Sequence, residues 1–134
     1  MAVLSTIEGI GPVYEEKLNG AGVGSCEALL EQGATKQGRA AIAAGSGLSE
    51  GQILKFVNHA DLMRVSGIGG EYAELLECAG VDTVPELAQR NAANLTVKMA
   101  EVNAEKSLVR SLPSETQVTG WVSQAKELER VVTH

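Results

Sequence analysis

Two short glycine segments are the strongest candidates for chemistry in this sequence. Each places a hydrophobic residue between two glycines and precedes a stretch with the apolar spacing of a helix. Glycine permits backbone angles that are closed to other residues, so each segment predicts a tight turn. The helix after such a turn begins with free N–H groups and a positive dipole end, which together favour a bound anion. The candidate binding residues of these turns are Gly9, Ile10, Gly11, Gly67, Ile68 and Gly69.

The segments that contain the two turns are similar to each other. A shift of 58 residues aligns residues 7–23 with residues 65–81 and pairs identical residues at nine of the seventeen positions. The identical positions, numbered in the first copy, are 9, 10, 11, 14, 16, 18, 21, 22 and 23. Such self-similarity predicts tandem units. We expect the units at residues 1–64 and 65–134, and we expect them to pack together because no Gly/Ser or Pro linker separates them.

Each unit is also predicted to close with a similar helix. Ser49 and Ser114 are each followed three residues later by glutamine, which is the pattern of a capping box. Phe56 and Trp121 then hold similar places, at a shift of 65, so the second unit carries several extra residues in its middle. Aromatic residues make up only 3% and hydrophobic residues 44%, so the core is mostly aliphatic. This composition favours packed helices over a sheet.

The charge of the chain argues against a simple nucleic-acid-binding protein. The formal net charge is −6. Residues 7–23 hold three acids against Lys17, a sum of −2, and residues 65–81 hold three acids and no base, a sum of −3. Like charge this close to a turn opposes a phosphate contact. Two interpretations therefore stay open, a purely structural use of the turns and a phosphate or carboxylate site.

Basic residues collect outside the turns, in two corresponding stretches. Residues 36–64 hold four bases and two acids, and residues 90–110 hold four bases and two acids, so each stretch sums to +2. These stretches could form basic patches on one face, although a solvated helix surface has the same composition. The candidate phosphate contacts are Lys36, Arg39, Arg64, Lys106 and Arg110.

Catalytic and metal-binding patterns are missing from the sequence. His59 and His134 are the only histidines. His59 has no carboxylate or cysteine at metal-ligand spacing, and His134 is the last residue of the sequence. We therefore expect no enzyme activity, no metal and no cofactor. We expect Cys26 and Cys78 to be buried free thiols, as is typical of proteins in a reducing compartment. Neither a signal peptide nor a membrane-spanning run is recognisable, so we expect a cytoplasmic protein without a membrane partner.

The glycine turns resemble the helix-hairpin-helix motif of many DNA repair, recombination and replication proteins. In that family the turn and the following helix start hold a backbone phosphate without reading base sequence. The residues that match are Gly9, Ile10, Gly11, Gly67, Ile68 and Gly69. The resemblance implies an all-α fold made of two small, SAM-like helical units, each opening with a helix-hairpin-helix.

Nearly the whole chain also resembles a bacterial family known as domain of unknown function number 4332. The similar segments are I-E-G-I-G-P at 7–12, G-A-T at 33–35, E-K-S-L-V-R at 105–110, L-P-S at 112–114, W-V-x-x-A-K-E-L at 121–128 and R-V-V-T-H at 130–134. This resemblance implies no activity. Our hypothesis is a non-enzymatic module that contacts the DNA or RNA backbone weakly and without sequence preference. The alternative is an adaptor that binds another protein or a second copy of itself.

Overall fold

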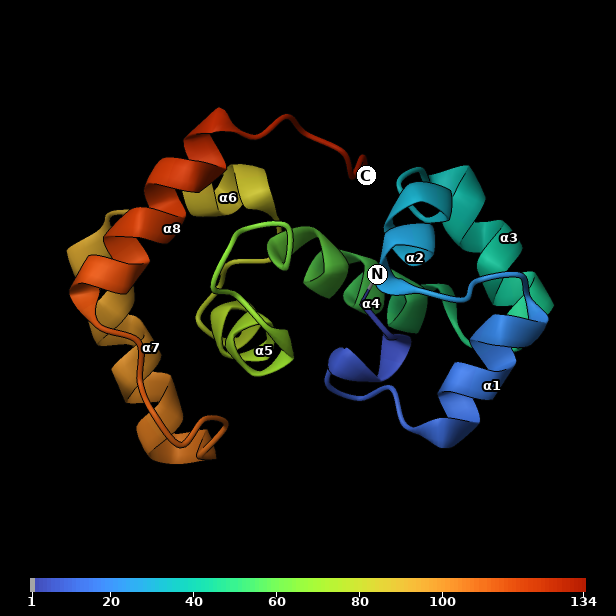
Figure 1. Ribbon diagram of the computed structural model, residues 1–134, viewed down its shortest axis with the longest axis horizontal. Helices are drawn as coiled ribbons and strands as arrows, with labels where there is room; N and C mark the ends of the chain where they lie inside the picture. The colour runs from blue at the N-terminus through green and yellow to red at the C-terminus, as the bar shows by residue number, and fades with distance from the viewer. Residues whose placement is uncertain (1) are drawn as a thin grey trace. The chain divides into compact units, whose positions relative to one another are not determined.

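The computed structural model describes residues 2–134, and the regular secondary structure of this part of the chain consists of helices only (Figure 1). The predicted all-α fold is thus confirmed. A short 3-10 helix at Leu4–Thr6 comes first. The α-helices that follow are α1 (Pro12–Gly20), α2 (Cys26–Gln32), α3 (Lys36–Ser46), α4 (Glu50–Leu62), α5 (Gly70–Cys78), α6 (Val84–Ala88), α7 (Ala92–Lys106) and α8 (Glu115–Glu127).

The chain divides into two compact units. Unit 1 comprises Met1–Asp61 together with Val131–His134, and unit 2 comprises Leu62–Arg130. The sequence alone placed the division after residue 64 and assigned the last residues to the second unit. The structure places it at the end of α4 and adds the C-terminal residues to unit 1.

Unit 1 packs α1 against α3, with α4 contributing the central aromatic side chain. Phe56 is buried, and so are Leu4, Ile7 and Leu18 from the start of the chain. Close packing requires glycine at Gly33, where a Cβ atom would lie 2.5 Å from Val57 Cγ2. Unit 1 therefore has an aliphatic core closed by one aromatic ring, in line with the composition of the chain.

Unit 2 packs α8 against α6 and α7, which Figure 1 shows running alongside it. Trp121 and Val122 of α8 are buried in a cluster that includes Leu76 and Met99. The chain turns into α8 at a capping box, in which the Ser114 hydroxyl accepts the Gln117 N–H at 3.1 Å and the Gln117 side chain accepts the Ser114 N–H at 2.8 Å. This confirms the helix start that was predicted there.

The corresponding capping box of α4 is present as well. The Gln52 N–H donates to Ser49 Oγ at 3.1 Å, and the Ser49 N–H donates to Gln52 Oε1 at 3.0 Å. Ser25 caps α2, since its hydroxyl accepts the Ala28 N–H at 3.1 Å. Thr83 holds the N-cap position of α6, but its hydroxyl lies 3.2 Å from Glu86 Oε1 instead of capping the helix.

Candidate functional site

The two glycine turns have the same backbone geometry. Gly9 and Gly67 have φ angles of +93° and +96°, which residues that carry a side chain rarely adopt. The N–H of Ile10 donates to the Ile7 carbonyl at 3.2 Å, and the N–H of Ile68 donates to the Val65 carbonyl at 3.1 Å. The 58-residue shift found in the sequence therefore also relates the local backbone of the two turns.

The isoleucines of both turns are not available to a ligand. Ile10 and Ile68 are buried, so their role is to anchor the turn and they are not exposed to a ligand. Gly11 and Gly69 are N-cap residues with extended backbone angles and no side-chain cap. The groups left to meet a ligand are the backbone N–H groups at the helix start.

The two helix starts differ in how many such N–H groups they offer. In α5 the first intrahelical donor is Ala73, whose N–H bonds to the Gly69 carbonyl at 2.9 Å, and Gly70, Glu71 and Tyr72 precede it. In α1 the corresponding first residue is Pro12, which has no N–H. The start of α5 therefore has one more backbone N–H without an intrahelical partner than the start of α1, at Gly70, which is itself buried.

An aromatic side chain from the closing helix lies beneath each turn. A Cβ atom on Gly67 would lie 2.9 Å from Trp121 Nε1, and one on Gly9 would lie 3.4 Å from Phe56 Cε1. The ring of Trp121 also lies 5.3 Å from that of Tyr72, centroid to centroid. The aromatic positions paired in the sequence thus support the glycine turns in both units.

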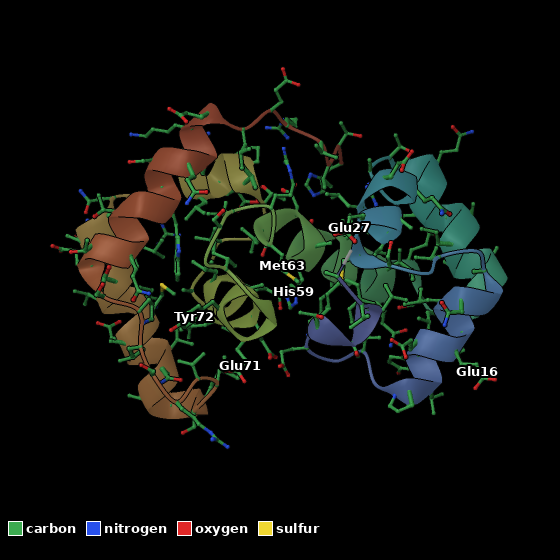
Figure 2. All side chains as sticks on the ribbon, viewed as in Figure 1. Glu16, Glu27, His59, Met63, Glu71 and Tyr72 are labelled. Atoms are coloured by element: carbon green, nitrogen blue, oxygen red, sulfur yellow. The ribbon has the colours of Figure 1, made fainter. Side chains whose placement is uncertain are left out.

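The second turn borders an open pocket of about 380 Å³ within unit 2. Figure 2 shows Glu71 and Tyr72, which both line it, on the first turn of α5. Its other lining residues are Gly67, Gly69, Gly70, Arg110 and Ser111. The segment between α7 and α8 thus brings an arginine to the pocket that borders the second turn.

Two sets of hydrogen bonds hold the segment that carries Arg110. The Tyr72 hydroxyl donates to the Ser111 carbonyl at 2.9 Å. The side chain of Asn103 accepts the Val109 N–H at 2.9 Å and donates to the Val109 carbonyl at 3.2 Å. Both neighbours of Arg110 are therefore fixed to unit 2.

The first turn differs in its surroundings. It borders a smaller depression of about 230 Å³, lined by Gly9, Gly11, Pro12, Val13 and Tyr14. None of these residues is charged, and Val13 is 64% exposed. The depression at the first turn therefore has no charged lining residue, whereas the pocket at the second turn is lined by one arginine and one glutamate.

The sequence suggested that Arg39 lies on a solvated basic patch. In the structure its side chain is only 4% exposed. Its Nη1 donates to the carbonyls of Gly33 and Ala34 at 2.9 and 3.1 Å, and its Nη2 donates to the Thr133 carbonyl at 2.7 Å. Burial lowers the pKa of this guanidinium, and the charge of Glu50 partly opposes the shift. Arg39 therefore holds unit 1 together.

The other basic candidates lie apart from the pocket at the second turn. Lys36 is the exposed first residue of α3 and borders a different pocket, of about 310 Å³, in unit 1. Arg64 is half-buried, and its Nη2 donates to the Glu129 carbonyl at 2.9 Å. Lys106 is exposed in the last turn of α7. Of the five basic candidates, Arg110 alone lines a pocket at one of the described glycine turns.

A difference between the two repeats could have pointed to Arg110. The connection between α3 and α4 spans residues 47–49, whereas the connection between α7 and α8 spans residues 107–114. Arg110 therefore lies on one of the stretches where the shift changes from 58 to 65. The sequence did not reveal the Tyr72–Ser111 bond that fixes this segment.

Neither a metal centre nor a membrane span is found in the described part of the chain. Residues 2–134 contain no group of three or more His, Cys, Asp or Glu side chains placed to hold a metal ion. His59 is fully buried on α4 (Figure 2). Among the same residues, every helix is too short or too polar to cross a bilayer.

Comparison with known families gives one match. A family model described as a domain of unknown function (DUF4332) matches residues 8–128. Comparison with curated proteins and with solved structures gives no match. The matched range contains both glycine turns and Arg110.

Proposed function

The chain belongs to the DUF4332 family, and we propose that its second glycine turn, used as a helix-hairpin-helix, binds a phosphate of a DNA or RNA backbone. The observation that carries this proposal is the position of Arg110 on the pocket lined by Gly67, Gly69 and Gly70. A guanidinium and the backbone N–H groups of a helix start are donors that a phosphate oxygen prefers. Such contacts do not read base sequence.

The same geometry predicts weak binding. Glu71 lines the pocket together with Arg110, so one negative charge offsets the positive one. The net charge of −6 adds a long-range repulsion from nucleic acid. We therefore propose a non-enzymatic, cytoplasmic binding protein whose contact with nucleic acid is electrostatic and falls with salt.

Fluorescence anisotropy of labelled single- and double-stranded DNA and RNA tests this function. A single phosphate contact predicts a slope of log affinity against log salt of about −0.9 for duplex DNA. Arg110→Gln should weaken binding, and Glu71→Gln should strengthen it by removing the repulsive charge. Lys106→Gln is the matched control, since it removes the same charge from a nearby exposed position outside the pocket.

Two results would count against the phosphate site. One is no binding at low salt and high protein concentration. The other is an equal loss in Arg110→Gln and Lys106→Gln, because that would show a general charge effect instead of a site at the turn. Circular dichroism of each variant establishes that the helices are intact.

The first turn favours a second candidate function, docking of an apolar side chain from a protein partner. Val13 is exposed beside Pro12 and Tyr14, in a depression without charged lining residues. Contiguous exposed apolar surface is typical of contact sites, whereas single exposed apolar residues are common. Val13→Glu should abolish partner capture by immobilised protein without changing nucleic-acid binding, and Val97→Glu, on exposed surface of α7, is the control.

A further inference from the structure

Residues 131–134, which we call the tail, form an extended segment bound to unit 1. Val132 is 2% exposed, so its side chain is buried. The Thr133 N–H donates to the Ala34 carbonyl at 2.8 Å, and the Thr133 hydroxyl donates to the same oxygen at 3.3 Å. The Thr133 carbonyl accepts from Arg39 Nη2 at 2.7 Å. One tail residue is thus held through both of its backbone groups.

The side chain that receives the tail is positioned by other contacts. Arg39 Nη1 donates to the carbonyls of Gly33 and Ala34, which lie in the loop between α2 and α3. These bonds fix the guanidinium without the tail, so Nη2 is already aimed when the tail arrives. A preorganised donor of this kind lowers the entropy lost on binding.

Recognition at this site uses only local features of the tail. It requires one residue with a free N–H and C=O, and an apolar residue immediately before it. Main-chain hydrogen bonds give affinity and a side-chain pocket gives specificity in peptide recognition of this type. The contacts therefore do not depend on which chain supplies the segment.

We propose that unit 1 also accepts the tail of a second copy of this chain, so that two molecules associate by exchanging tails. A second copy carries the identical Val-Val-Thr sequence, which satisfies the same contacts. The tail follows residues 128–130, which lie beyond the end of α8, so it can be redirected without breaking a helix. Exchange of an identical segment is a common route to symmetric dimers.

A labelled peptide of residues 128–134 tests the site first. The acceptor is the full chain with Val132→Asp, in which the buried valine is replaced by a charge that releases the chain's own tail. We expect the fluorescence anisotropy of the labelled peptide to rise when this acceptor is added. On the unmodified chain its affinity should be at least about tenfold weaker, because the attached tail competes at roughly millimolar effective concentration. A peptide with Val132→Asp should not bind, and Val97→Asp is the control protein.

Association of whole chains is tested by sedimentation velocity. The donor is the full chain with Arg39→Met, which weakens its own tail site and leaves the tail intact. Mixed with the Val132→Asp acceptor, it should form a 1:1 complex that neither variant forms alone. Absence of peptide binding to a helical acceptor would overturn the site. Peptide binding without a complex between chains would overturn the assignment to a second copy. If a variant loses its helical circular dichroism signal, tail exchange is tested with the unmodified chain instead. The unmodified chain should then form dimers above about millimolar concentration. A chain that stays monomeric at that concentration would refute the proposal.

Discussion

Replacing Gly67 by alanine tests the physical basis of the second turn. The φ angle of +96° at Gly67 lies in the left-handed region, where an L side chain costs about 1–2 kcal/mol. The new Cβ atom would also lie 2.9 Å from Trp121 Nε1, closer than real Cβ contacts allow. Trp121 is buried and cannot move without repacking unit 2, which adds about 1–3 kcal/mol. We expect Gly67→Ala to lower the free energy of unfolding of unit 2 by about 2–5 kcal/mol.

The corresponding change in unit 1 separates the two contributions. Gly9 has nearly the same φ angle, +93°, but its Cβ atom would lie 3.4 Å from Phe56 Cε1, which is nearly an ordinary contact. Gly9→Ala should therefore cost only the backbone term, about 1–2 kcal/mol. Gly120→Ala is the control, because Gly120 lies inside α8 with open space around it, and alanine there should stabilise by about 0.5–1 kcal/mol.

Urea unfolding followed by fluorescence and circular dichroism measures these differences. Trp121 is the single tryptophan of the chain, so its emission reports on unit 2, while circular dichroism reports on both units. Two units can unfold in separate transitions, and each is then fitted separately. If Gly67→Ala costs no more than Gly9→Ala, the contact with Trp121 does not constrain the turn. If neither variant is destabilised, the left-handed geometry of both turns is refuted.

Two further predictions concern the thiols and the start of α8. Burial, with a smaller effect from Glu27, raises the pKa of Cys26 from 9.0 to about 11, so Cys26 should react slowly with a thiol reagent at pH 8. Cys78 was expected to be buried but is only half-buried, so it should react faster, and Cys78→Ser should remove the fast reaction. Because the folded pKa of Cys26 is the higher one, Cys26 stabilises the fold below pH 9 and the contribution is lost as the pH rises through 11; unchanged urea midpoints between pH 9 and 11 would contradict this. Ser114→Ala should lower the free energy of unfolding by about 1 kcal/mol, because it removes the capping box of α8. The control Ser123→Ala, on the exposed face of α8, should change it by less than about 0.5 kcal/mol. Equal urea midpoints for these two variants would refute the role of the cap.

The local features of this protein were readable from the sequence because each depends on residues a few positions apart. The all-α fold, the capping boxes at Ser49 and Ser114 and the positive φ at Gly9 and Gly67 belong to this class. Helix capping and tight turns are decided by the backbone and its nearest neighbours, so residue type and spacing determine them.

The roles of the arginines were decided by the tertiary structure. Arg39 and Arg110 are alike in the sequence, yet Arg39 is buried because a carbonyl 94 residues away, at Thr133, completes its hydrogen bonds. Arg110 lines the pocket at the second turn, where the hydroxyl of Tyr72, 39 residues from Ser111 in the sequence, holds the carbonyl of that neighbouring residue. Composition and residue spacing do not predict hydrogen-bond partners that lie so far apart in the sequence. A basic residue in the sequence therefore predicts a charge, and the fold determines whether that charge meets solvent, a ligand or the protein's own backbone.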